Sequence, residues 1–98
     1  MKTDTSEAIT ALLLEAEQAH GVYETIDLNG VYDKDWPRWY GEYVIEHGLA
    51  DIVGRVTPLD RVTMVLETAY AEFDRADPKP AASWAEHLGR RMSEELAA

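Results

Sequence analysis

Residues 5–28 have the sequence TSEAITALLLEAEQAHGVYETIDL, and this stretch decides the fold class of the chain. Its apolar residues recur at i, i+3 and i+4, the spacing of one face of an amphipathic α-helix. Gly21 lies inside the stretch, but the apolar spacing continues across it, which favours one long helix. Asn29 and Gly30 then supply residues that adopt left-handed backbone and end helices. The apolar stripe consists of Ile9, Leu12, Leu13, Ala16, Ala19, Tyr23 and Ile26.

A second helix is predicted directly after this stretch. Asp35 is expected to be its N-cap, and Pro37 is tolerated in its first turn because the missing N–H would have no partner inside the helix. Gly48 is expected to end it, and residues 49–53 are predicted to form a short turn. No part of the chain alternates apolar and polar residues with the period of two that strands require, so the fold class is all-α.

The third and fourth helices begin with more specific signals. Thr57 is the expected N-cap of the third helix, with Pro58 at its first helical position. Ser83 and Glu86 have the spacing of a capping box and are expected to start the fourth helix. Residues 77–80, Asp-Pro-Lys-Pro, are predicted to form a stiff break between the two. The apolar stripes are Leu59, Val62, Leu66, Ala69, Tyr70 and Phe73 in the third helix and Trp84, Leu88, Met92 and Leu96 in the fourth.

The length of 98 residues predicts a single helical domain over residues 1–98. Short links between four helices favour a small antiparallel bundle, which the long first helix would brace. A chain this short has room for one modest core, so a homodimer that pairs the first helices is the alternative to a monomer.

The charge of the chain excludes several classes of partner. There are 19 acidic against 9 basic residues, for a net charge of −10. Nucleic acid and anionic membranes are disfavoured, because phosphate recognition needs clustered lysine and arginine, and positively charged partners are favoured. Residues 1–33 are the most acidic part, with seven acids and one base. The plainer interpretation is that the charge keeps a small domain in solution. A third hypothesis for the function is an acidic inhibitor that imitates nucleic acid.

Cysteine and apolar runs limit the function further. The chain has no cysteine, which removes disulfides, thiolate metal sites and cysteine nucleophiles. No apolar run approaches the roughly 20 residues of a membrane span, and the first residues lack the pattern of a signal peptide. The expected location is therefore the cytoplasm, with no membrane association.

A cluster of aromatic residues is the first candidate site. Trp36, Trp39, Tyr40 and Tyr43 follow i, i+3, i+4 and i+7, so they share one face of the second helix. Such a face is most simply part of the core, since aromatic side chains supply much of the burial of a small domain. The functional alternative is an aromatic pocket or partner groove, to which Tyr23 of the first helix would contribute.

A second candidate combines carboxylates with imidazoles. Glu17 and His20 form a Glu-x-x-His pair, and Glu24 lies one turn further along the same helix. Pairs of this kind bind metals in ferritin-like bundles, and Glu46 and His47 of the second helix could complete a site for iron, manganese or zinc. The simpler interpretation of His20 is a hydrogen-bonded residue at the edge of the core.

Acidic residues also crowd the segment between the first two helices, residues 27–35. The segment resembles a calcium-binding loop only superficially, because Tyr32 stands where the sharp turn needs glycine and Arg38 where a bidentate glutamate is required. Its acids are expected to cap the second helix and to solvate a turn.

Three motifs of the sequence carry a resemblance to known proteins: Ala19-His20-x-x-Tyr23-Glu24, then Asp35-Trp36-Pro37-x-Trp39-Tyr40-x-x-Tyr43, then His47-Gly48-Leu49. With these motifs the chain resembles a group of small bacterial helical proteins over about residues 12–54. The resemblance implies a small soluble helical protein and brings no activity or ligand with it. The expected function is therefore a non-enzymatic protein-interaction or regulatory module, which binds a protein partner or a second copy of itself. The alternative is a bundle that binds a metal or small ligand through the His and Glu residues of its first two helices.

Overall fold

A computed structural model describes residues 2–76 and 83–97 of the chain, and it confirms the all-α class. The described residues form five helices rather than the four predicted. The helices are α1 (Lys2–Ile26), α2 (Trp36–Glu46), α3 (Leu49–Val53), α4 (Leu59–Arg75) and α5 (Trp84–Leu96).

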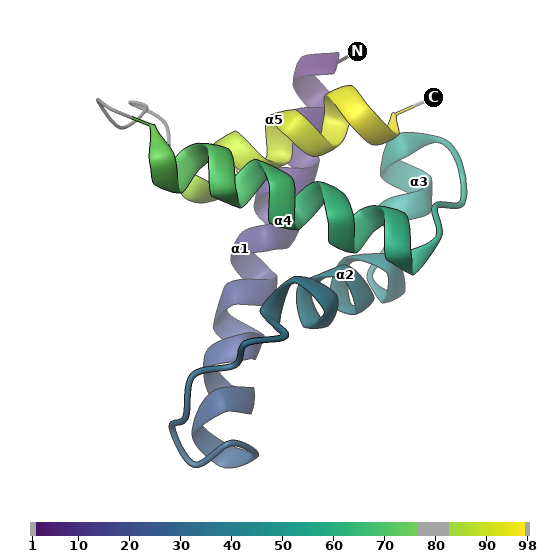
Figure 1. Ribbon diagram of the computed structural model, residues 1–98. Helices are drawn as coiled ribbons and strands as arrows, with labels where there is room; N and C mark the ends of the chain where they lie inside the picture. The colour runs from purple at the N-terminus through teal and green to yellow at the C-terminus, as the bar shows by residue number, and fades with distance from the viewer. Residues whose placement is uncertain (1, 77–82, 98) are drawn as a thin grey trace.

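The helices pack around α1, which is the longest of them (Figure 1). In this view α4 and α5 lie side by side, run in opposite directions and cross α1 steeply, while α2 lies below α4. The lower end of α1 extends past the other helices, and the segment that leads to α2 returns along it. The antiparallel arrangement expected for the whole bundle is therefore not confirmed.

The core lies between the five helices: α5 packs on α1 and α4, α2 packs on α1 and α4, and α3 packs on α1 and α2. The predicted stripe of α1 is buried at its N-terminal end, but Ile26 is 69% exposed. The difference arises because the end of α1 extends past the helices that would cover it. The buried core residues are Ile9, Leu12, Leu13, Ala16, Tyr40, Val44, Leu49, Val53, Val62, Val65, Leu66, Ala69, Ala85, Leu88, Met92 and Leu96.

The ends of the first three helices follow the sequence signals with one exception. α1 continues unbroken through Gly21, as predicted, and Asn29 and Gly30 follow it with positive φ angles of 51° and 80°. Residues 49–53, predicted to be a turn, instead form the short helix α3. Gly48 precedes it with a φ of 110°, a left-handed conformation that favours glycine and separates α2 from α3.

The predicted N-caps have mixed outcomes. The Ser83 side chain accepts a hydrogen bond from the backbone N–H of Glu86, which confirms the start of α5. Asp35 occupies the N-cap position of α2, but its side chain makes no capping bond. The expectation for Thr57 is wrong, because Pro58 is the N-cap of α4 and the Thr57 hydroxyl is buried without a hydrogen-bond partner. The predicted break at residues 77–80 lies outside the described residues.

The backbones of α1 and α5 approach closely at Gly89 of α5. A Cβ atom there would collide with the Thr10 hydroxyl and would lie 3.0 Å from the Ser6 carbonyl oxygen and 3.1 Å from the Thr10 backbone nitrogen. The same Thr10 hydroxyl donates to the Ser6 carbonyl at 2.9 Å and lies 3.5 Å from the Ala85 carbonyl. The missing side chain of Gly89 thus allows α1 and α5 to pack backbone against backbone.

Gly89 and Gly21, which both lie inside helices, give a matched prediction for stability. Gly89→Ala is expected to lower the free energy of unfolding by about 1–3 kcal/mol, because the added methyl group forces α1 and α5 apart. Gly21→Ala, where nothing lies within 4 Å of the added Cβ, is expected to raise it by about 0.5–1 kcal/mol through helix propensity. Denaturant unfolding followed by circular dichroism measures both, and a Gly89→Ala variant as stable as the wild type would contradict the close packing.

Candidate functional site

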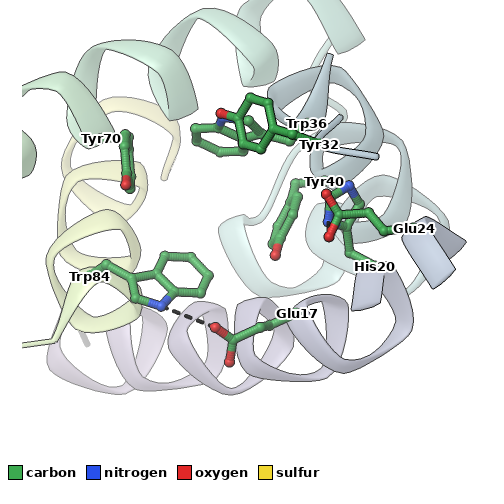
Figure 2. A pocket seen from close by; sticks show the side chains of 8 residues that line it. All are labelled: Glu17, His20, Glu24, Tyr32, Trp36, Tyr40, Tyr70 and Trp84. Atoms are coloured by element: carbon green, nitrogen blue, oxygen red, sulfur yellow. Dashed lines mark hydrogen bonds and ion pairs between the residues drawn. The ribbon is translucent and has the colours of Figure 1, made fainter. Parts of the chain in front are cut away.

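The largest cluster of aromatic side chains surrounds a surface pocket of about 280 Å³ (Figure 2). Side chains from α1, α2, α4, α5 and the segment before α2 reach it, so it forms only when these parts of the chain are assembled. Its lining residues are Glu17, His20, Glu24, Tyr32, Trp36, Tyr40, Tyr70 and Trp84.

Four of the rings stand nearly perpendicular to their neighbours. Trp36 meets Tyr70 with ring centres 5.1 Å apart and an interplanar angle of 73°, and meets Tyr40 at 5.6 Å and 85°. Tyr40 in turn meets Trp84 at 6.0 Å and 81°. Successive perpendicular rings surround the open space as adjoining walls of a box do, and Figure 2 shows this arrangement with Tyr40 between Trp84 and His20.

Tyr40 is the most buried of the aromatic rings around the pocket, with 7% of its surface exposed. Its hydroxyl points toward the Glu17 end of the pocket in Figure 2. Burial, followed by the negative charges of Glu17 and Glu24, raises the pKa of Tyr40 above its ordinary value of 10.0. The phenol is protonated at neutral pH, and burial is the main cause of its raised pKa, with a smaller contribution from the two nearby carboxylates.

Glu17 joins α1 to the start of α5 across the pocket. Its Oε2 atom accepts a hydrogen bond from Trp84 Nε1 at 3.2 Å, drawn as the dashed line in Figure 2. The bond fixes the orientation of the Trp84 ring. It also holds the carboxylate beside the ring, so a negative charge lies at the edge of an aromatic wall.

The segment that carries Tyr32 is fastened to α1 by Asp33. Its Oδ2 atom accepts a hydrogen bond of 2.8 Å from Nε2 of His20, a side chain that is 6% exposed. Because a carboxylate only accepts, Nε2 must be the protonated nitrogen of this pair. The backbone N–H of Asp33 donates to Glu24 Oε2 at 3.2 Å, and Nδ1 of His20 lies 3.8 Å from Glu24 Oε1. We call the three side chains His20, Glu24 and Asp33 the latch.

The aromatic face predicted from the sequence is divided between two environments. Trp36 and Tyr40 line the pocket, whereas Trp39 and Tyr43 turn to its other side, where they stack on each other at 5.6 Å and 18°. Tyr23 packs on Trp39 at 5.6 Å, also outside the pocket. Trp36 and Trp39 are both half-buried, so the face is neither entirely core nor entirely pocket.

The residues proposed as metal ligands separate into two groups. Glu17, His20 and Glu24 lie at the pocket, while Glu46 and His47 are exposed at the end of α2. The His47 ring stacks on Tyr43 at 3.9 Å, and its Nδ1 donates to the Tyr43 carbonyl. Within the described part of the chain, no three His, Asp or Glu side chains gather in a group that could hold a metal ion.

Four residues of the site and its latch were missed by the sequence analysis. Tyr70 and Trp84 were assigned to apolar stripes of later helices, and no local pattern indicates that they meet α2. Tyr32 precedes the second helix and was not placed on its aromatic face. Asp33 was expected to help cap α2 or to solvate a turn, yet it binds His20. Asp33 lies 13 residues from His20, so no local spacing indicates this contact either.

Comparison of the chain with protein families, with curated proteins and with solved structures finds no significant match. No helix in residues 2–76 and 83–97 is both long enough and apolar enough to cross a membrane. The site is therefore interpreted from its own geometry.

The latch predicts a local effect of removing Asp33. Asp33→Ala is expected to lower the free energy of unfolding by about 1–3 kcal/mol, because it leaves the buried His20 nitrogen without its acceptor. It should also speed the hydrogen exchange of the amides of residues 33 and 35, since the Asp35 N–H donates to Asp33 Oδ1. Asp27→Ala removes an exposed acid from the same segment and is the control. Equal exchange rates in both variants would contradict a latch.

The raised pKa of Tyr40 predicts a loss of stability in alkali. Above its ordinary pKa of 10.0 the phenol ionises in the unfolded chain while the folded protein keeps it protonated, so the unfolded state is favoured as the pH rises. The effect begins at about pH 10 and approaches about 1.4 kcal/mol per pH unit as the pH rises further toward the raised pKa of the folded protein. Tyr40→Phe should lose less stability over this range in denaturant titrations, and equal slopes for the two proteins would contradict the prediction.

Proposed function

We propose that this protein is a non-enzymatic binding module that takes a positively charged group of its partner into the aromatic pocket. The observation that supports the proposal is the combination of five aromatic rings and two carboxylates around one opening. Ring faces attract cations, and the attraction is strongest where water is excluded. The nearby carboxylates add negative charge, which attracts a cation but not a neutral ligand.

The charge of the whole chain supports the same class of partner. The net charge is −10, and α1, which contributes Glu17 and Glu24, belongs to the most acidic third of the sequence. A field of this sign accelerates the approach of a basic partner and repels an acidic one. A protein with a basic segment fits this field better than a second copy of the chain does. The homodimer and the cytoplasmic location remain predictions.

The size of the pocket limits what enters it. A volume of about 280 Å³ is below the roughly 300–1,000 Å³ of pockets that enclose whole ligands. The pocket therefore suits one compact group, such as a side chain or a head group, while the rest of the partner stays outside.

The polar groups around the pocket support binding rather than chemistry. Glu17 orients Trp84, and His20 and Glu24 hold the segment that carries Tyr32. Each of them positions a wall of the pocket. The Tyr40 phenol remains protonated at neutral pH, which suits a neutral hydrogen-bonding group at the floor of a binding site.

A titration with small organic cations tests the proposal. The three tryptophans give separate indole N–H signals in ¹⁵N-labelled protein. Methylguanidinium, ethanolamine and choline are added in turn, with 3,3-dimethylbutan-1-ol as the uncharged analogue of choline. At least one cation is expected to shift the signals of Trp36 and Trp84 at concentrations where the alcohol does not. Trp39, whose ring lies outside the pocket, is the internal control.

A charge variant isolates the contribution of the carboxylate. Glu17→Gln retains an acceptor for Trp84 Nε1 but removes the charge, and it should weaken cation binding by about three- to tenfold. Glu15→Gln makes the same change at an exposed position of α1 that does not line the pocket, and it should leave affinity unchanged. Equal binding of the alcohol and the cations, or no shift of Trp36 and Trp84, would overturn the proposal.

A further inference from the structure

Both carboxylates and the histidine at the pocket already make a hydrogen bond within the protein. Glu17 Oε2 accepts from Trp84 Nε1, and Glu24 Oε2 accepts from the Asp33 backbone, both at 3.2 Å. His20 donates its Nε2 proton to Asp33. A primary ammonium has three N–H donors, each of which needs an acceptor once the group leaves water. In the pocket the acceptors are mainly tyrosine hydroxyls and two carboxylates that each already hold one donor, while much of the lining is ring surface.

The rings provide the opposite kind of surface. The perpendicular arrangement of Trp36 with Tyr70 and Tyr40, and of Tyr40 with Trp84, encloses the space from several sides. A quaternary ammonium group is nearly spherical, spreads its positive charge over its methyl groups and has no N–H to satisfy. Such a group contacts several ring faces at once, which is how aromatic cages recognise quaternary ammonium ligands.

The carboxylates complete this recognition without contacting the cation through a hydrogen bond. Glu17 and Glu24 already produce the negative potential that acts on Tyr40. A diffuse methylated cation loses less hydration on entering the pocket than a primary ammonium does, because it donates no hydrogen bonds to water. It therefore retains more of the electrostatic attraction as net affinity.

From these three features we infer that the pocket selects a quaternary ammonium group over a primary ammonium group. The inference rests on the proposed function, since it names the class of cation that the same pocket takes. Two sources share this chemistry. One is a free small molecule with a trimethylammonium head group, and the other is a trimethylated lysine side chain of a partner protein.

The test compares affinities of matched cations for the full chain by the tryptophan signals described above. Choline is compared with ethanolamine, which has the same hydroxyethyl group on a primary ammonium. A short neutral peptide with one trimethyl-lysine is compared with the same peptide carrying unmodified lysine. In at least one of the two pairs, the methylated member is expected to bind roughly tenfold more tightly or better. The pair that shows the difference identifies the source of the group.

Variants check that the selectivity comes from the cage. Tyr70→Leu removes a ring that is 38% exposed, so the fold is expected to persist, and it should reduce the preference for the methylated cation severalfold. Tyr43→Leu removes a half-buried ring from α2 outside the pocket and should leave the preference unchanged. Circular dichroism and the unfolding midpoint of each variant verify folding before affinities are compared.

The remaining outcomes separate this inference from the proposed function. If the unmethylated cations bind as tightly as the methylated ones, or more tightly, the inference is overturned while the binding of cations stands. If the uncharged analogue of choline matches choline, or if no cation binds, both the inference and the proposed function are overturned. A preference that survives Tyr70→Leu but is lost in Tyr43→Leu would place the site outside this pocket and would overturn both the inference and the proposed function.

Discussion

The close packing of α1 on α5 is the constraint on which both the core and the pocket depend. At Gly89 the two backbones approach so nearly that a methyl group does not fit, and the Thr10 hydroxyl lies between the two helices near the Ala85 carbonyl. Trp84 precedes Ala85 at the start of α5, so the contact that fixes the helix also fixes the ring. Trp84 consequently comes within hydrogen-bonding distance of Glu17 on α1. A wider separation of the helices would lose the core contact and the pocket wall together.

The site carries more negative than positive charge. Glu17, Glu24 and Asp33 bring three carboxylates to one region, and the neighbouring histidine, His20, is hydrogen-bonded to one of them. Some acids elsewhere are paired with arginine, as where Arg91 binds Glu72 at 2.9 Å and lowers the pKa of that carboxyl. At the pocket the acids lie beside aromatic rings, whose faces attract cations rather than anions. The negative charge at the pocket therefore lies where the geometry can receive a positive group.

The sequence predicted local features well and long-range ones poorly. The period of the apolar residues gave the long first helix, and the capping pattern of Ser83 gave the start of α5, because both are determined by residues within a few positions. Pro58 shifted the start of α4 by one residue, since its fixed φ also suits the cap position it occupies. The meeting of Trp36 with Tyr70 depends on how α2 crosses α4, and no spacing within either helix determines that angle.

The aromatic face of α2 shows why the choice between core and pocket could not be made from spacing alone. Trp36 and Tyr40 are one turn apart, as are Trp39 and Tyr43, but the two pairs are offset around the helix and meet different neighbours. Which pair lines a cavity therefore depends on α4, α5 and the segment before α2. Helices hold four of the five pocket rings, whereas Tyr32, 68% exposed, depends on the latch. A site with most of its walls preformed loses little conformational entropy on binding. Tyr32 is the wall whose position can adjust to a ligand, because a loop rather than a helix carries it.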